Sequence, residues 1–266
     1  MRLFTANIHA NVDGYGRRTD ALGVVTACDA DLLFVQELWR GQEDDVAVIT
    51  HAGWTCVAYE PFGTAHRFTQ GPGGRGWEPP LGLLSGDRGL YFTSHRPLSP
   101  RRRRERDARG GGEVGEWGVG LFTRHRVESV TTVPVRQLRR DKTGRTVIWA
   151  NLVDPQGQRY VAIALHGPHL SHGSLLHYRG LARYIDLHSD ARPIVMAGDF
   201  NCWRPLLRVV FPKWRSAIRA RTWPAWMAHS QIDHVLLRGQ WSVTKTSTVH
   251  TGSDHLALAI ELNLPS

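Results

Sequence analysis

The sequence predicts an α/β protein, in which buried strands end in polar side chains and amphipathic helices lie between them. Residues 194–197, within PIVMAGDFN, form an apolar run typical of a buried strand, and Gly198 lets the backbone turn out of the sheet. Asp199 and Asn201 would project on one side at the carboxyl end of that strand, where open α/β architectures hold ligands. There a carboxylate can orient or deprotonate water while the amide donates to a phosphate oxygen. An Asx turn explains an isolated GDxN equally well, so the other elements must decide.

Composition indicates one soluble domain with a polyanionic partner. The 266 residues, taken as a single catalytic domain 1–266, carry a formal net charge of +9 and a pI near 10.1. Because only three of the 33 basic residues are lysines, part of this excess reflects a preference for arginine. The three cysteines form no paired framework or zinc spacing, which favours a reducing compartment. With no signal peptide or membrane span in the pattern, we expect a cytoplasmic monomer without a protein partner.

Two strands are expected near the N-terminus, each with a polar ligand at its end. Residues 3–8 are typical of a buried opening strand that delivers Asn7 to one face. Residues 32–35 form a second continuous apolar run, which ends at Glu37. Glu37 would then lie at the same edge of the sheet as Asn7, unless it is an ordinary solvated residue at the end of a strand.

Residues from about 62 to 115 form an insertion rich in Gly, Pro and Arg. The stretches 71–76 and 100–112 are expected to be flexible, because they cannot bury enough apolar surface to become ordered. Only residues 81–94 contain segments capable of strand pairing. The arginines at 101–104 either follow a nucleic-acid backbone or belong to a solvated surface loop.

Regular secondary structure is expected to resume after the insertion. Residues 119–123 are strand-like, with Glu116 at their entrance. Residues 145–153 and 159–165 predict an antiparallel hairpin, whose second strand ends in His166.

The run HGPHLSH invites a zinc interpretation, since it contains His166, His169 and His172. Its short, irregular spacing and its lack of Cys or carboxylate partners disfavour that interpretation. A single imidazole at a strand end that donates to a phosphate is favoured instead.

Amphipathic helices are expected in two places. Residues 18–28 place apolar side chains at helical spacing. The second helix is capped by Ser171 or Ser174. Its apolar stripe consists of Leu175, Tyr178, Leu181, Ala182 and Ile185.

Residues 203–226 interleave aromatic and basic side chains. The aromatic residues are Trp203, Phe211, Trp214, Trp223 and Trp226, and the basic ones include Arg204, Arg208, Lys213, Arg215, Arg219 and Arg221. Such a mixture can stack bases and follow phosphates. For Trp223 and Trp226 the alternative, that the rings fill the core beneath a loop, is slightly favoured.

The last strands carry three more polar candidates. Residues 231–237 form a strand with Asp233 near its start, and residues 241–249 are expected to pair with it. Asp254 and His255 then enter a final apolar strand.

Taken together and in this order, these strand-end residues resemble those of the endonuclease/exonuclease/phosphatase superfamily, the deoxyribonuclease I-like fold. The matching motifs are TANIH, FVQEL, the strand ending in LHGPH, AGDFN, QIDHVL and GSDHLAL. The resemblance covers the chain apart from the insertion. It implies a four-layer sandwich, in which two packed, mixed and largely antiparallel sheets are flanked by helices. It also implies phosphoester hydrolysis, although it does not specify the substrate.

The resemblance implies a metal site and a phosphate site. Asn7, Glu37 and Asp254 would bind a hard divalent ion, most simply Mg²⁺ and alternatively Mn²⁺. Asp199 would position or activate the attacking water. Asn201 and His166 would donate to the non-bridging oxygens and so take part in both catalysis and substrate binding.

Five more residues complete the implied site. Asp233 would hold His255, which then acts as general acid or base or as a cation on the phosphate. Glu116 would orient His166, as a second carboxylate does in the deoxyribonuclease and sphingomyelinase branches. From the aromatic and basic region, Arg204 and Trp223 are the candidates for binding substrate.

Two positions depart from the family's patterns. His9 stands where the abasic-site repair branch has an Asp, and that branch's tyrosine has no match, so repair at abasic sites is disfavoured. Cys202 directly follows GDFN, where we interpret it as a small buried residue rather than an oxidation-sensitive thiol.

We therefore expect a divalent-metal-dependent phosphodiesterase that acts as a nuclease on DNA or RNA, with endonuclease and exonuclease action both open. One alternative is the same machinery acting on sphingomyelin, a nucleotide or an inositol phosphate. A non-catalytic nucleic-acid-binding protein is the alternative from another class.

Overall fold

The computed structural model describes residues 1–12, 18–67, 90–92, 113–133, 135–139, 141 and 143–264, and only the backbone of residues 66 and 90–92. Most of the insertion expected at about 62–115 is therefore not described. The stretches 71–76 and 100–112, including the arginines at 101–104, lie outside the described residues. Of the segment 81–94, residues 90–92 form a short strand and the others lie outside the described residues.

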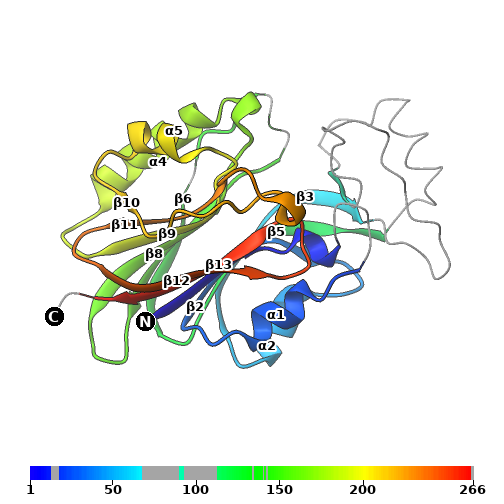
Figure 1. Ribbon diagram of the computed structural model, residues 1–266, viewed down its shortest axis with the longest axis horizontal. Helices are drawn as coiled ribbons and strands as arrows, with labels where there is room; N and C mark the ends of the chain where they lie inside the picture. The colour runs from blue at the N-terminus through cyan, green and yellow to red at the C-terminus, as the bar shows by residue number, and fades with distance from the viewer. Residues whose placement is uncertain are drawn as a thin grey trace.

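Two stacked β-sheets form the centre of the fold (Figure 1). The seven-stranded sheet has the order β12-β13-β1-β2-β5-β3-β4. Its strands are β1 (Arg2–Asn7), β2 (Leu32–Arg40), β3 (Thr55–Arg67), β4 (Leu90–Phe92), β5 (Glu113–Thr123), β12 (Ser242–His250) and β13 (Leu256–Asn263). The six-stranded sheet has the order β10-β11-β9-β8-β7-β6. Its strands are β6 (Arg126–Val133), β7 (Val147–Val153), β8 (Arg159–His166), β9 (Ile194–Asp199), β10 (Arg215–Ser216) and β11 (Asp233–Arg238).

Helices cover the outer faces of both sheets and give the four layers that the family resemblance implies. Figure 1 shows α1 and α2 against the seven-stranded sheet and α4 and α5 against the other. The α-helices are α1 (Ala21–Ala27), α2 (Asp45–His51), α4 (Ser174–His188) and α5 (Arg204–Val210), and the 3₁₀ turns are η1 (His9–Asn11), η2 (Leu170–His172) and η3 (Ala225–Met227). Among the described residues, none of these helices is long and apolar enough to span a bilayer.

Three apolar clusters match the three interfaces between the layers. The central cluster joins the two sheets and includes Phe34 from one and Val195 from the other. A second cluster packs the six-stranded sheet against α4 through Tyr178 and Leu181. The third packs the seven-stranded sheet against α1 and α2, with Val25 and Ile49 at its centre. Alternate side chains of each strand thus face different clusters, as the strand period of two requires.

One central pair of strands in each sheet is parallel. β1 runs parallel to β2 in the seven-stranded sheet, and β8 runs parallel to β9 in the six-stranded sheet. The recorded pairings of all the other named strands are antiparallel. The two parallel pairs contact each other across the central core. Their carboxyl ends, which carry the polar motifs, therefore meet at one edge of the sandwich.

Two local predictions are wrong. Residues 241–249 do not pair with β11, because β9 and β10 occupy the two edges of that strand, and β12 pairs with β13 in the other sheet instead. Gly239 turns the chain at φ 93°, and the buried Trp241 donates from Nε1 to the Ile194 carbonyl oxygen at 3.1 Å. Neither Ser171 nor Ser174 caps α4, since Gly173 occupies the N-cap position in a left-handed conformation.

A buried ion cluster closes the base of the insertion. Arg67 is the last residue of β3, and its side chain is fully buried. Its Nη2 lies 2.5 Å from Oε2 of Glu113, which opens β5, and 2.9 Å from Oε2 of Glu43. The guanidinium carbon lies 4.9 Å from the centroid of the Trp39 ring. The two strands that border the insertion are thus joined by charge as well as by the ladder.

We expect substitution of Gly198, the glycine of β9, to destabilise the fold strongly. Its φ is 146°, and an added Cβ would lie 2.0 Å from the Leu165 carbonyl oxygen. Gly157 has φ 83° with nothing within 4 Å of an added Cβ, so Gly157→Ala isolates the backbone strain, about 1 kcal/mol. Gly198→Ala adds overpacking and should cost about 2–4 kcal/mol in chemical denaturation. Equal losses for the two variants would show that the approach to Leu165 does not constrain the strand.

Candidate active site

The carboxyl ends of the two parallel strand pairs bring four polar side chains together. Asn7 Nδ2, at the end of β1, lies 3.1 Å from Oε1 of Glu37 and 3.2 Å from Oδ2 of Asp199. His166 Nε2, at the end of β8, lies 3.5 Å from Oδ2 of Asp199 and 3.7 Å from Oε1 of Glu37. All four residues are buried. Four motifs from distant parts of the chain therefore meet at one site, with these contacts between 3.1 and 3.7 Å.

Glu37 reaches this site because β2 is irregular there. The register with β5 shifts between Gln36 and Leu38, and Glu37 adopts φ 56°. A bulge of this kind redirects one side chain without ending the strand. A left-handed conformation is strained for glutamate, and such strain is concentrated at functional sites. The sequence predicts the position of Glu37 but not this bulge, because β2 continues to Arg40.

Asp199 is held by amide groups of two asparagines. Its Oδ1 accepts from the Asn201 backbone nitrogen at 2.7 Å, and its Oδ2 accepts from Asn7 Nδ2 and, at 3.3 Å, from Asn201 Nδ2. Asn201 Nδ2 also donates to the Gly167 carbonyl oxygen at 3.1 Å and lies 3.2 Å from His166 Nε2. Asn201 therefore orients both Asp199 and His166, and it adopts φ 47° to do so.

A carboxylate–imidazole pair faces Asp199 from the other side. His255 Nδ1 lies 2.9 Å from Asp233 Oδ2, and His255 Nε2 lies 3.9 Å from Asp199 Oδ2. Burial lowers the pKa of His255, but Asp233, Asp254 and Asp199 outweigh burial and raise it to about 10. Burial and the Asp233 carboxylate raise the pKa of Asp199. In this arrangement the imidazole is a cation held between carboxylates.

Asp254 is fixed by the loop that precedes β11. Its Oδ2 accepts from Trp223 Nε1 at 3.4 Å, and its Oδ1 accepts from Ser253 Oγ at 3.3 Å. Burial raises the pKa of Asp254, but His9, His255 and these donors outweigh burial and lower it. Asp254 is therefore an ionised carboxylate beside the same imidazole that faces Asp199.

The donor chemistry of this site fits a hard divalent cation. Asp199, Asp233 and His255 have ligand atoms within 4.8 Å of one another, although His255 and Asp233 are already hydrogen bonded to each other. Glu37 adds a further negative charge that raises the pKa of Asp199. Buried carboxylates that repel one another are stabilised by a cation that takes oxygen ligands. The predicted set of Asn7, Glu37 and Asp254 supplies such oxygens. Asn7 contacts Glu37 through its amide nitrogen at 3.1 Å, while its Oδ1 accepts from the His9 backbone nitrogen at 3.0 Å.

The imidazole of His166 is backed by aromatic rings and an arginine. Its ring centroid lies 5.6 Å from that of Trp117 and 5.9 Å from that of Phe62. The guanidinium carbon of Arg145 lies 5.2 Å and 5.1 Å from the same two rings. Arg145 Nη1 also donates to the His166 carbonyl oxygen at 3.3 Å, and its Nε donates to Asp141 Oδ2 at 3.1 Å. Burial, followed by the charge of Arg145, lowers the pKa of His166 well below its usual value.

The structure does not place Glu116 beside His166. Glu116 is exposed and lies opposite Arg40 in the ladder between β5 and β2. Its neighbour Trp117 projects to the opposite face of β5 and contacts the imidazole instead. The prediction placed Glu116 on the face of β5 that the next residue, Trp117, occupies. A buried Trp and a buried Arg thus occupy the position where a carboxylate was expected.

The residues predicted to bind substrate lie in different environments. Trp223 is half-buried and its indole donates to Asp254, so it supports a site residue rather than presenting a free ring face. Arg204 is half-buried at the start of α5. Trp226 is 62% exposed, which shows that the core interpretation of this ring is wrong.

Several site residues escaped the sequence analysis. Arg145, Phe62 and Trp117 are ordinary residues of strands or loops, and only the packing reveals that they surround His166. The favoured use of HGPHLSH, a single imidazole at the site, agrees with the position of His166. The rings of His169 and His172 contact each other edge to face at 5.7 Å. In the described part of the chain, the group that could hold a metal includes none of these three histidines. Cys202 is buried, as expected.

Comparison with known proteins agrees with this geometry. A model of the Endonuclease/Exonuclease/phosphatase family matches residues 4–255. The chain belongs to the endonuclease/exonuclease/phosphatase family. Comparison of the sequence with curated proteins gave no match.

Solved structures of family members share the fold at low sequence identity. The human Nocturnin catalytic domain with bound sulfate is 14% identical, with a TM-score of 0.66 over 99% of this chain and 94% of that one. An endonuclease/exonuclease/phosphatase from Beutenbergia cavernae is 19% identical, with a TM-score of 0.64 over 99% of this chain and 71% of that one. D. rerio TDP2 in complex with a single-strand DNA product is 12% identical, with a TM-score of 0.62 over 99% of both chains.

We expect Arg145→Met to disturb His166 specifically. The substitution keeps an apolar stem but removes the group that fixes the His166 carbonyl, and it leaves the buried Asp141 without the arginine charge, with only the Thr143 donors beside it. Arg67→Met is a matched control, because it also removes a buried arginine from a carboxylate and a Trp ring. Both variants should lose stability, by about 3–5 kcal/mol in denaturation. Only Arg145→Met should shift the His166 ring resonances in ¹H–¹⁵N NMR, and equal shifts in both variants would indicate general loosening.

The pair formed by Asp233 and His255 predicts a pH-dependent stability in the metal-free protein. Because folding raises the pKa of His255 to about 10, the stabilisation is complete below the unfolded value of about 6.5 and is lost as pH rises toward 10. The difference in unfolding free energy between wild type and Asp233→Asn, measured in EDTA, should therefore shrink between those values. Asp186→Asn, which removes a surface partner of Arg238, should give a flat difference. A flat difference for Asp233→Asn as well would contradict the pairing.

Proposed function

We propose that this protein is a Mg²⁺-dependent phosphodiesterase that cleaves DNA or RNA. The observation that carries the proposal is the environment of Asp199, whose Oδ2 lies within 3.9 Å of groups from Asn7, His166 and His255. A buried carboxylate that is oriented by amides and faced by two imidazoles is suited to position a water for attack on phosphorus.

In this proposal Asp199 orients the attacking water and accepts its proton. The water oxygen forms a bond to phosphorus, the P–O bond to the leaving group breaks, and the leaving oxygen takes a proton. His255 can supply that proton or stand as a cation against the phosphate, since Asp233 holds its Nδ1 at 2.9 Å and leaves Nε2 facing the site.

Asn201 and His166 would contact the non-bridging oxygens. The N–H groups of Asn201 already have acceptors, so a phosphate oxygen would replace His166 Nε2 as one of them. His166 Nδ1 has no hydrogen-bond partner among the described residues, so once a phosphate oxygen replaces the Asn201 contact at Nε2, the form that donates from Nε2 is available.

Asn7, Glu37 and Asp254 would hold the metal ion. When bound, a divalent ion neutralises the charge that builds on the phosphate and its leaving oxygen. The chain's own contribution is a fixed set of oxygens, held by the bulge at Glu37 and by the loop hydrogen bonds to Asp254.

Charge supports nucleic acid as the substrate class. The formal net charge of +9 attracts a polyanion over a distance set by screening. Arg208, Lys213, Arg219 and Arg221 are exposed in the region that follows the GDFN motif. Among the similar structures, one is described with a single-strand DNA product bound. This likeness and the charge together favour nucleic acid over a neutral headgroup.

Asp199→Asn provides the decisive test. It preserves size and removes the charge that orients water, so hydrolysis of plasmid, single-stranded DNA and RNA in Mg²⁺ should fall about 100-fold or more. Asp186→Asn, on the exposed face of α4, is the matched control and should retain activity. Mn²⁺ should support the reaction and EDTA should abolish it.

Two results would contradict the proposal. Unchanged cleavage by Asp199→Asn would show that another group activates the water. Hydrolysis of sphingomyelin or bis-p-nitrophenyl phosphate without any cleavage of DNA or RNA would transfer the same machinery to a small phosphoester.

A further inference from the structure

The two expected metal ligands at β1 and β2 lie on backbone that departs from the regular ladder. Beyond Asn7 the chain makes the turn η1, whose three residues have φ values between 49° and 58°. Successive left-handed residues other than glycine are strained, so the surrounding structure must hold them. Glu37 lies in the bulge of β2. The positions of both ligands therefore depend on what fixes the turn and the bulge.

One buried carboxylate is bonded to both segments. Asp45, the first residue of α2, is 1% exposed. Its Oδ1 accepts from Asn11 Nδ2 at 2.9 Å, and its Oδ2 accepts from the Trp39 backbone nitrogen at 2.7 Å. Asn11 ends the turn that follows Asn7, and Trp39 lies two residues beyond Glu37. Each oxygen of this carboxylate thus holds a segment that carries one expected ligand.

The bond to Trp39 satisfies a backbone group that β1 does not reach. β1 pairs with β2 as far as Asn7 and Gln36, and the Ile8 nitrogen adds a bond to the Gln36 oxygen at 3.0 Å. Trp39 lies beyond this point and is fully buried, and a buried N–H needs an acceptor. Asp45 supplies that acceptor where β1 has already turned away.

The turn transmits this restraint to Asn7. The His9 nitrogen donates to Asn7 Oδ1 at 3.0 Å, which fixes the direction in which the amide faces. An amide oxygen has two lone pairs, so this bond leaves one for a cation. Arg67, in the buried ion cluster at the base of the insertion, donates from Nη1 to the Ala10 oxygen at 3.2 Å. A turn bonded at Ala10 and Asn11 therefore presents its first N–H to Asn7 in one orientation.

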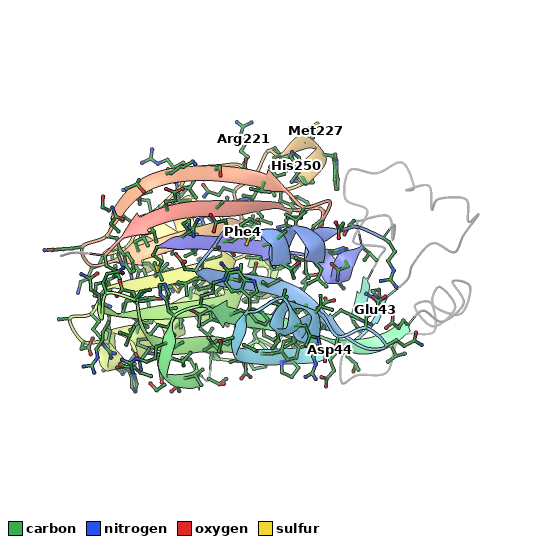
Figure 2. The ribbon with its side chains drawn as sticks, turned by 90° about the horizontal axis from the view of Figure 1, so that it is seen from below. Phe4, Glu43, Asp44, Arg221, Met227 and His250 are labelled. Atoms are coloured by element: carbon green, nitrogen blue, oxygen red, sulfur yellow. The ribbon has the colours of Figure 1, made fainter. Side chains whose placement is uncertain are left out.

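The charge state of Asp45 depends on burial and on its charged neighbours. Burial raises its pKa to about 7, while the Trp39 bond and the charge of Arg67 oppose the rise and Glu43 and Asp44 add to it. Glu43 is exposed and Asp44 is half-buried, at the lower right of Figure 2. Above pH 7 the carboxylate form, which accepts both hydrogen bonds, predominates.

We propose that Asp45 is a positioning residue for the candidate metal site, because its carboxylate couples the turn after Asn7 to the strand segment after Glu37. This inference rests on the proposed function, which assigns the metal ion to these ligands. Asp45 acts through hydrogen bonds, since both of its oxygens are bonded to the chain. Replacing a residue that orients a metal ligand typically costs about 10- to 100-fold in metal affinity.

The competing interpretation is that Asp45 only stabilises the start of α2. The structure gives that role to its neighbour, because Asp44 Oδ1 accepts from the Val46 nitrogen at 3.0 Å and from the Ala47 nitrogen at 3.1 Å. Asp44 is the N-cap residue of the helix. The two adjacent aspartates therefore provide a matched comparison between capping the helix and positioning the ligands.

The test measures metal binding rather than turnover. Calorimetric titration of the metal-free protein with Mn²⁺ at pH 8.5 should give a dissociation constant about tenfold or more higher for Asp45→Asn than for wild type. The amide keeps one acceptor but turns an NH₂ group toward the second donor. Asp44→Ala, which uncaps the same helix, should bind Mn²⁺ as wild type does. Equal affinities for Asp45→Asn and wild type would overturn the proposal.

Asn11→Gly interrupts the same connection from its other end. Glycine adopts the left-handed conformation without strain, so this variant removes the bonds of the side chain to Asp45 and to the Leu22 nitrogen but keeps the turn. It leaves Asp45 bonded to Trp39, so it carries the comparison even if Asp45→Asn does not fold. Combined with Asp45→Asn, it should give a less than additive loss of Mn²⁺ affinity, whereas additive losses would contradict the coupling.

A readout without metal separates this inference from the proposed function. In the metal-free protein, the side-chain amide signals of Asn7 in ¹H–¹⁵N NMR should shift in Asp45→Asn and stay in place in Asp44→Ala. If they do so but wild type binds no Mn²⁺, Asp45 still positions Asn7 and the proposed metal dependence fails. If wild type binds Mn²⁺ and Asp45→Asn changes neither the signals nor the affinity, the metal site stands and the role of Asp45 fails.

Discussion

The structure depends on the contact between two parallel strand pairs, β1–β2 and β8–β9, across the central core. Antiparallel neighbours alternate their carboxyl ends between opposite edges, whereas parallel neighbours bring them to the same edge. One such pair in each sheet is enough to bring Asn7, Glu37, His166 and Asp199 to one place. The hydrogen bond from Asn7 to Asp199 shows this constraint most directly, because it joins residues 192 positions apart in the chain. The remaining strands widen the two sheets and enclose the core that holds the pairs in register.

A buried polar site of this kind is costly unless its groups satisfy one another. Here Asn201 connects Asp199 to His166, and Asp233 holds His255, so these polar groups are hydrogen bonded although the carboxylates outnumber the cationic imidazole. The residual repulsion between carboxylates is the reason that the site fits a divalent ion. The side chains packed around the His166 imidazole differ from those expected, because the Arg145 guanidinium and two aromatic rings lie where a carboxylate was predicted. This environment favours a neutral imidazole, in contrast to His255, which faces the same Asp199 oxygen, and gives the two histidines different chemistry.

The sequence predicts the strands that end in site residues, because each combines an apolar run with a polar terminus and both signals are local. It therefore identifies Asp199, His166, Asp233 and His255 before any contact is known. Two kinds of feature escape it. The partner of β12 depends on which strand edges remain available, and β9 and β10 occupy those of β11. The face on which Glu116 or Trp117 lies depends on register, which a bulge elsewhere in the sheet can shift by one residue. Arg145 could not be assigned from sequence, since its role consists entirely of packing against His166.

The aromatic and basic region shows how the same composition can serve two purposes. Trp223 and Trp226 lie three residues apart, yet one indole is bonded to Asp254 and the other is exposed. A hairpin whose base is fixed and whose tip is open produces this division, because the residues next to the bridge turn inward while those in the turn face solvent. The consequence is mechanical. A force on the tip acts on the Asp254 backbone through the Ala225 hydrogen bond, so the conformation of the loop and the geometry of a carboxylate at the candidate metal site are not independent. Substitutions in this loop are therefore expected to change turnover, whereas those on the exposed face of α4 do not.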